Sequence, residues 1–330
     1  MQPSKARLSI RRASTIAVTA IVSLGSTLAC AESINPPTTV QVSPAMNAQE
    51  QRNLAFVLDW WREVLQGGHL ELTPNYQAED YIQHNPNLPT GRAAFESFFK
   101  NVVGVKPANP IPATLDPAPV LAGAKGDFVF LIFEQQSQDP RDPQMTYYHN
   151  SFEVLRLENG KVQEHWDSVK RMPAPPGAPK PAPFEQPASQ MARGNFGTLS
   201  ADERRNLELA TIEMKDMLQY GHLELADEVM DPDYIQHNPN VPQGRDGFKQ
   251  FMSRIPGRTP REIKPEWVAA PVLTLVSGPY VWMMWDRTDK DPNDPTREYV
   301  WNHFDVLRIE NGLIKEHWDE AVIAPPPAAQ

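Results

Sequence analysis

Hydrophobic positions change their period once within each half of the chain. The spacing of three and four residues that marks one face of a helix is seen first at Leu54, Val57, Trp61, Val64 and Leu65. Two glycines at 67–68 follow this run, and glycine is a common helix stop. The first half therefore opens with an amphipathic helix.

The second half opens in the same way. Ser200 and Glu203 form a capping box, the sequence signature of a helix start, and the apolar run that follows ends at Gly221. Shorter helices are expected near residues 72–80, 91–103, 225–231 and 244–255.

The remainder of each half alternates between apolar and polar positions, as strands do. In the first half we expect strands at 128–136, 147–157 and 161–169, with an Asn-Gly hairpin turn at 159–160. Asp-Pro-rich segments at 139–143 and 291–295 are expected to be turns. Helices followed by an antiparallel meander predict an α+β fold for each half.

The similarity of the two halves is an internal repeat. Residues 81–92 return as 234–245 with ten of twelve positions identical, and Glu164–Asp167 returns unchanged 152 residues later. A period this long suits two domains that each bury a core, and not a solenoid. We expect domains at 47–171 and 200–323, a semi-rigid Pro-rich linker at 172–199 and a Pro/Ala tail at 324–330.

The first 31 residues have the composition of a secretory signal peptide. Four basic residues precede an apolar stretch at 13–28, and Ala29-Cys30-Ala31 supplies a small-residue cleavage site. Twin-arginine and lipoprotein signals are the alternatives, but the expected apolar residues after Arg12 are missing and Leu28 is one position too close to Cys30. The sequence thus predicts a secreted or periplasmic protein.

Removal of that segment would change the charge and the available chemistry. The net charge would fall from −10 to −14, and the only cysteine would be lost. So acidic a chain repels phosphate backbones and anionic lipids, which argues against nucleic-acid binding. The apolar stretch is also too short for a membrane span. A small molecule or another protein is the expected partner.

The repeated motifs resemble a known family. The Tyr-Ile-Gln-His-Asn-Pro segment, the Gly-Arg helix start, and Phe-x-Val-Leu-Arg-x-Glu-Asn-Gly leading into Glu-His-Trp-Asp are similar to SnoaL-like polyketide cyclases, within the nuclear-transport-factor-2-like superfamily. The resemblance implies two tandem cones, each with about three helices on a curved antiparallel sheet and a pocket between them. It also implies sheet-to-sheet pairing, which two copies in one chain would supply internally, and it leaves further oligomerisation open. Cyclases, isomerases, hydrolases and simple binders share this fold, so it does not fix the reaction.

The last strand of each half carries the sharpest candidate chemistry. Side chains alternate along a strand, so His165 and Asp167 share one face, and His317 and Asp319 repeat the arrangement. Inside a pocket such a pair could move protons next to a carbonyl group without a cofactor. The alternative is structural, with the pair bonded to backbone or to Arg156 at the edge of the sheet.

The other repeated histidines offer weaker candidates. We expect a ligand-binding rim at Tyr81, His84, Asn85, Tyr234, His237 and Asn238. Turn chemistry around Asn-Pro explains the same residues equally well. His69 and His222 follow helix ends and are read as structural.

A metal site is the rival interpretation. His84, His165 and Asp167 supply the residue types of a two-histidine, one-carboxylate triad, although nothing in their spacing demands a metal. We therefore expect no metal and no cofactor. Three hypotheses remain, namely an acid–base enzyme, a non-catalytic small-molecule binder and a pseudo-dimeric interaction protein.

Overall fold

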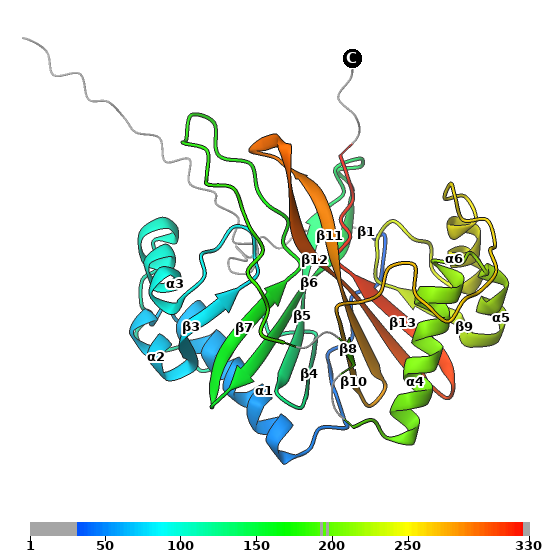
Figure 1. The fold of residues 1–330 in the computed structure, drawn as a ribbon, viewed down its shortest axis with the longest axis horizontal. Helices are drawn as coiled ribbons and strands as arrows, with labels where there is room; N and C mark the ends of the chain where they lie inside the picture. The colour runs from blue at the N-terminus through cyan, green and yellow to red at the C-terminus, as the bar shows by residue number, and fades with distance from the viewer. Residues whose placement is uncertain (1–31, 192–193, 196–197, 326–330) are drawn as a thin grey trace, which may run out of the picture.

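The structure is a computed structural model that describes residues 32–191, 194–195 and 198–325. The predicted signal peptide and the end of the predicted tail lie outside these residues. Figure 1 shows two sheets facing each other in the middle of the molecule, with helices on the outer side of each. The predicted fold class, two tandem α+β domains, is confirmed.

The first domain opens with helix α1, Ala48–Trp60, which continues as a π-helical segment over Trp61–Gln66. Asn47 caps α1 by accepting hydrogen bonds from the backbone of Gln49 and Glu50, and the Glu50 carboxylate accepts one from Asn47 in return. The remaining helical segments are short: Leu70–Leu72, α2 (Thr73–Tyr76), α3 (Arg92–Phe98) and Phe99–Val103.

The second domain repeats this order. Helix α4 spans Ala201–Thr211 and begins at the predicted capping box of Ser200 and Glu203. It also continues as a π-helical segment. The segments that follow are Ile212–Met217, Leu223–Leu225, α5 (Ala226–Val229) and α6 (Arg245–Met252).

Among the described residues the first sheet has seven strands, in the order β2-β4-β5-β6-β7-β3, with β1 on β6. Their bounds are β1 (Glu32–Ser33), β2 (Gln41–Val42), β3 (Gln77–Gln83), β4 (Leu121–Lys125), β5 (Phe128–Gln138), β6 (Met145–Glu158) and β7 (Lys161–Asp167). The helix expected near 72–80 is therefore wrong after Tyr76, because residues 77–83 form β3. This strand pairs parallel to β7, so the sheet is mixed and not a pure meander.

The second sheet has six strands in the described part of the chain, in the order β8-β10-β11-β12-β13-β9. Their bounds are β8 (Gly194–Asn195), β9 (Met230–Gln236), β10 (Leu273–Ser277), β11 (Tyr280–Asp291), β12 (Asp294–Glu310) and β13 (Leu313–Asp319). Strand β9 pairs parallel to β13, as β3 does to β7. The predicted hairpin turns form in both sheets, with positive φ at Asn159 (50°) and Asn311 (54°).

Each sheet has one face covered by its own helices and one face against the other sheet. The shared apolar layer includes Phe130 and Phe152 of the first sheet and Trp282 and Phe304 of the second. The ring centroids of Phe130 and Trp282 are 4.6 Å apart, and Phe152 stacks on Phe304 at 5.7 Å. The two domains thus form the internal pair that was expected.

Two extended arms tie the pair together. The first arm, residues 32–43, precedes α1 and places β2 beside β4, whereas the second arm, residues 185–191 and 194–195, precedes α4 and places β8 beside β10. Neither arm was expected as sheet structure. No helix in the described ranges is long and apolar enough to span a bilayer.

Candidate functional site

The predicted histidine and aspartate of the first domain lie on the helix-covered face of β7. The ring of His165 meets the edges of Trp60 and Trp61, with centroids 6.1 and 6.0 Å apart, and Asp167 is buried on the same face. Trp166, between them, lies in the layer between the sheets. His165 and Asp167 therefore share one face of β7, as the pattern predicts, and that face points toward the helices.

Three more polar side chains complete the first-domain site. His165 Nε2 lies 2.7 Å from Glu153, and His165 Nδ1 lies 3.1 Å from the hydroxyl of Tyr81. Asn85 Nδ2 donates to Asp167 over 2.8 Å. Tyr81 and Asn85, predicted for the ligand-binding rim, thus contact the strand pair, while Glu153 was missed as a partner.

Burial dominates the electrostatics of this first site. It lowers the pKa of His165 to about 4, so the imidazole is neutral at pH 7. Burial, with help from the charge of Glu153, raises the pKa of Asp167 to about 7, and burial also raises the pKa of Glu153. A carboxyl group of this kind can both accept and return a proton near neutral pH.

The second domain keeps the geometry and changes the charge. Glu213 stands at the position of Trp60, and its carboxylate lies 3.0 Å from His317 Nδ1. Asp305 lies 3.0 Å from Nε2 of the same ring. Although burial opposes it, the charges of Glu213 and Asp305 hold the pKa of His317 well above its usual range. This imidazole is a cation at neutral pH.

A second cation reinforces this network. His303 Nε2 lies 3.2 Å from Asp305, and His303 Nδ1 contacts Glu320. Burial opposes protonation here too, but the charges of Asp305 and Glu320 raise the pKa of His303 to about 10. The first domain has Ser151 at this position, so the sequence marked His303 only as unmatched and its role was missed.

A cavity of about 360 Å³ opens beside this network. His317 and Asp319 line it, together with Arg258 and apolar side chains such as Trp285. Asp319 is partly exposed, and it accepts hydrogen bonds from Asn238 Nδ2 and from a backbone amide, both over 2.9 Å. The carboxylate is thus oriented while open to the cavity.

Arg258 also lines the cavity, and no sequence pattern pointed to it. It follows α6 in a segment without strand or helix structure, where no repeated motif marks it. Its Nη1 donates to the carbonyl of Leu218 over 2.7 Å, whereas its Nε makes no hydrogen bond within the described part of the chain. Burial lowers its pKa, but an arginine remains charged at any physiological pH.

His84 and His237 correct the predicted rim. They stack on Trp166 and Trp318 at 4.7 and 4.6 Å, on the opposite face of each sheet from the sites above. His84 Nε2 lies 3.2 Å from Glu164, and the second domain repeats this contact. The side chain at 84 follows β3 directly and takes the face opposite to Tyr81, because the two are three positions apart.

Tyr234 and Asn238 behave like their first-domain equivalents. The hydroxyl of Tyr234 lies 3.1 Å from His317 Nδ1, and Asn238 holds Asp319. Four of the six residues predicted for ligand binding therefore lie at the two strand sites. The two histidines among the six lie between the domains.

The metal triad of His84, His165 and Asp167 does not form, because His84 lies on the other face. Each domain instead brings one histidine and two carboxylates together, with ligand atoms within 4.8 Å: Glu153, His165 and Asp167, and Asp305, His317 and Asp319. In the second set both ring nitrogens already face carboxylates and the ring is protonated. A metal ligand must be neutral imidazole, so an ion-pair network describes this set better.

The other polar side chains that the sequence singles out make structural contacts. Arg156 and Arg308 pair with Glu164 (2.8 Å) and Glu316, on the face of each sheet opposite to His165 and His317. The structural role expected for His69 is supported by its contacts with Glu71 and the carbonyl of Ala108, both 2.7 Å.

Residues 213–317 match the family model of the SnoaL-like domain. This segment of the second domain is therefore similar to the SnoaL-like domain. The first domain repeats its strand order, its motif and its inward-facing histidine and aspartate. No curated protein matches the chain.

Several solved structures are similar to part of the chain. One from Acidithiobacillus ferrooxidans, assigned to the polyketide cyclases, is 18% identical and covers 37% of this chain and 89% of its own, with a TM-score of 0.26. One from Jannaschia, assigned to the SnoaL-like polyketide cyclases, is 15% identical. It covers 40% of this chain and 100% of its own, with a TM-score of 0.27. An NTF2-like protein of unknown function from Mesorhizobium loti is 17% identical. It covers 38% of this chain and 97% of its own, with a TM-score of 0.27.

Proposed function

We propose that this chain is a cofactor-independent acid–base enzyme acting on a small apolar carbonyl or cyclic compound. The observation that carries the proposal is the cavity of the second domain, in which the oriented Asp319 lies beside the charged His317. Pockets that combine apolar walls with a few converging polar groups are where ligands bind in most proteins.

The apolar walls bind the hydrocarbon part of the substrate. Met214 and Trp285, both buried, line the cavity together with the charged groups. Their burial favours a compact, largely apolar molecule, and it removes water from the region around Asp319. Exclusion of water strengthens every electrostatic interaction that the charged groups make with the substrate.

Asp319 acts as the base. Its carboxylate takes a proton from the carbon next to the substrate carbonyl, and the electrons of the C–H bond form an enolate whose negative charge lies on oxygen. When the enolate is conjugated with a neighbouring double bond, the same carboxyl group then returns the proton to a different carbon, which gives isomerisation. In an aldol cyclisation the enolate carbon attacks a second carbonyl instead, and the proton goes to the new alkoxide.

Arg258 and His317 stabilise the enolate. The guanidinium of Arg258 supplies a donor on the cavity wall. Both nitrogens of His317 face Glu213 and Asp305, so the ring acts as a fixed positive charge and not as the proton carrier. Charge that is already oriented before the reaction is a main source of transition-state stabilisation.

In the first domain we propose a related site, in which the histidine is neutral and not charged. Asp167, with a pKa of about 7, is the base, and the neutral His165 is a hydrogen-bonding partner instead of a cation. Trp60 and Trp61 press on the ring from the helix. We propose that the two sites bind different substrates or differ in rate.

The place of action follows from the N-terminal sequence. The basic, apolar and small-residue order of residues 1–31 supports export, so we propose that the mature protein is secreted or periplasmic. Its acidic charge supports a small-molecule partner over nucleic acid.

Exchange of carbon-bound hydrogen tests the proposal without knowledge of the natural substrate. The mature protein is incubated in D2O with an apolar cyclic ketone such as β-tetralone, and deuterium at the carbon next to the carbonyl is followed by NMR. Catalysed exchange that is lost in the double variant Asp167→Asn, Asp319→Asn supports acid–base catalysis. Ketone binding without any catalysed exchange would favour a non-catalytic binder.

A further inference from the structure

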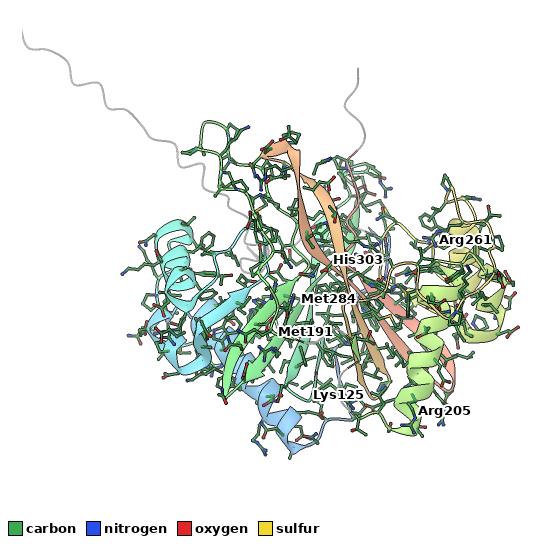
Figure 2. The ribbon with its side chains drawn as sticks, viewed as in Figure 1. Lys125, Met191, Arg205, Arg261, Met284 and His303 are labelled. Carbon is green, nitrogen blue, oxygen red and sulfur yellow. The ribbon has the colours of Figure 1, made fainter. Side chains whose placement is uncertain are left out.

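A second cavity of about 360 Å³ lies between the domains, on the opposite face of the first sheet from the His165 site. Its lining includes His84 and Trp166 of the first domain, Asp286 and Met284 of the second, and Met191 of the second arm. Figure 2 shows Met191 and Met284 in the centre of the molecule, where the two sheets meet. The acid–base site does not use this cavity.

The pseudo-symmetric place on the second domain is filled by the chain itself. There Thr38 of the first arm inserts its hydroxyl between the Trp318 indole, which donates to it over 3.0 Å, and His237 Nδ1, at 3.2 Å. The backbone amide of Thr38 donates to the Glu134 carboxylate over 2.8 Å. Asn35 adds a hydrogen bond from its side chain to the His237 carbonyl, over 3.0 Å.

The two places use equivalent protein groups. His84 and His237 are 153 residues apart, and Trp166 and Trp318, like Glu134 and Asp286, are 152 apart. The arms also correspond in register, because Gln41 pairs with Leu121 and Gly194 with Leu273. An indole, an imidazole and a carboxylate therefore surround both places.

The two arms differ at the positions of Thr38 and Asn35. At the same offset of 153, Met191 stands in place of Thr38 and Ala188 in place of Asn35. Neither carries a hydroxyl or an amide side chain. His84 is only 2% exposed, and its Nδ1 has no hydrogen-bond partner in the described part of the chain. A buried polar atom in that state is costly, which indicates that a partner belongs there.

We propose that this cavity binds a small vicinal amino alcohol. Its hydroxyl would take the place of the Thr38 hydroxyl, between Trp166 and His84, and an N–H on the adjacent carbon would donate to Asp286. The apolar remainder would pack on Met191 and Met284. Thr38 itself carries an amide N–H and a hydroxyl on adjacent carbon atoms. The groups that Thr38 supplies in the second domain therefore indicate which ligand groups fit the open cavity beside His84.

Binding of capped threonine, N-acetyl-threonine methylamide, to the mature protein tests the proposal directly, with capped valine as the isosteric control. Ligand-observed NMR should give saturable binding of the threonine compound, at least tenfold tighter than that of the valine compound. Equal binding of the two compounds, or none of the threonine compound at 10-millimolar concentration, would overturn the proposal.

Two variants locate the site. His84→Phe keeps a ring on Trp166 and removes Nδ1, and it should weaken binding at least tenfold. The double variant Ala188→Asn, Met191→Thr copies the first arm, so it should fill the cavity with its own hydroxyl, abolish binding and raise the melting temperature. Unchanged binding in the folded double variant would place the ligand elsewhere and contradict the proposal. Asp319→Asn serves as the control in the other cavity and should leave this binding unchanged.

Discussion

Glu213 and Trp60 occupy the same position of the long helix in the two halves, and both contact the histidine of the last strand. The carboxylate of Glu213 lies 3.0 Å from His317, whereas the indole of Trp60 meets the edge of His165. In both copies the position adjoins the start of the π-helical segment, a helix irregularity that is frequent at functional sites. This exchange of a carboxylate for an indole contributes to the difference in charge, in which His165 is neutral and His317 is a cation.

The first prediction concerns the charge states themselves. His165 should stay neutral until the pH falls to about 4, while His317 should remain protonated through neutral pH. Side-chain ¹⁵N shifts of the two imidazoles, followed between pH 3.5 and 9, measure this difference. Two histidines titrating together near 6.5 would show that the surroundings do not act as described.

The second prediction isolates Glu213. Replacing it by Gln removes one of the two charges that hold His317 protonated, so the pKa of His317 should fall, with Asp305 still raising it. Glu213→Trp, which copies the first domain, should lower it further. The same ¹⁵N titration reads both variants, and Glu208→Gln, at an adjacent turn of α4, is the control that should leave His317 unchanged.

The third prediction concerns stability and pH. The pKa of His303 is raised to about 10 in the folded state, so its stabilising contribution is complete below about pH 6.5 and is lost as the pH rises through 10. His303→Ser, which copies Ser151, should lower the free energy of unfolding of the second domain by about 1.5–3 kcal/mol at pH 6. Urea titrations at pH 6 and pH 10 measure this, and the effect should shrink at the higher pH. An equal loss at both pH values would contradict the ion-pair account.

The fourth prediction concerns the pairing of the domains. Trp282 is almost fully buried and packs on Phe130 of the other domain. Trp282→Ala should lower the free energy of unfolding by about 3–5 kcal/mol, because it opens a cavity in a layer shared by both sheets. Urea unfolding should show both domains destabilised, with the exposed Val268→Ala as control. Destabilisation confined to the second domain would contradict a shared core.

Much of the fold was predictable because it depends on local signals. The capping box at Ser200 and the turn at Asn159 act within a few residues, and both form as expected. The inward face of His165 and Asp167 follows from the period of two along a strand. The internal repeat then extended each of these inferences to the other half.

The rest depends on contacts between segments that are distant in sequence. The local pattern extends a helix to residue 80, but residues 77–83 form β3 because β7 offers a parallel edge more than 80 residues away. That strand also sets the face of His84, which therefore lies on the other side of the sheet from Tyr81 and Asn85. Arg258 and Glu320 lie outside the repeated motifs, and only the folded chain brings them to the site.

The catalytic assignment of Asp319 is tested most directly by separating binding from proton transfer. The rate of deuterium exchange and the Kd of the same ketone are measured for the mature protein, for Asp319→Asn and for Asp246→Asn, a substitution of the same type at an exposed position. Each measurement is made in a background that carries Asp167→Asn, so that only the second site contributes. We predict that Asp319→Asn loses at least a hundredfold in exchange rate with its Kd changed by less than threefold, and that Asp246→Asn loses neither. An Asp319→Asn protein that exchanges deuterium as fast as its parent would show that Asp319 is not the base.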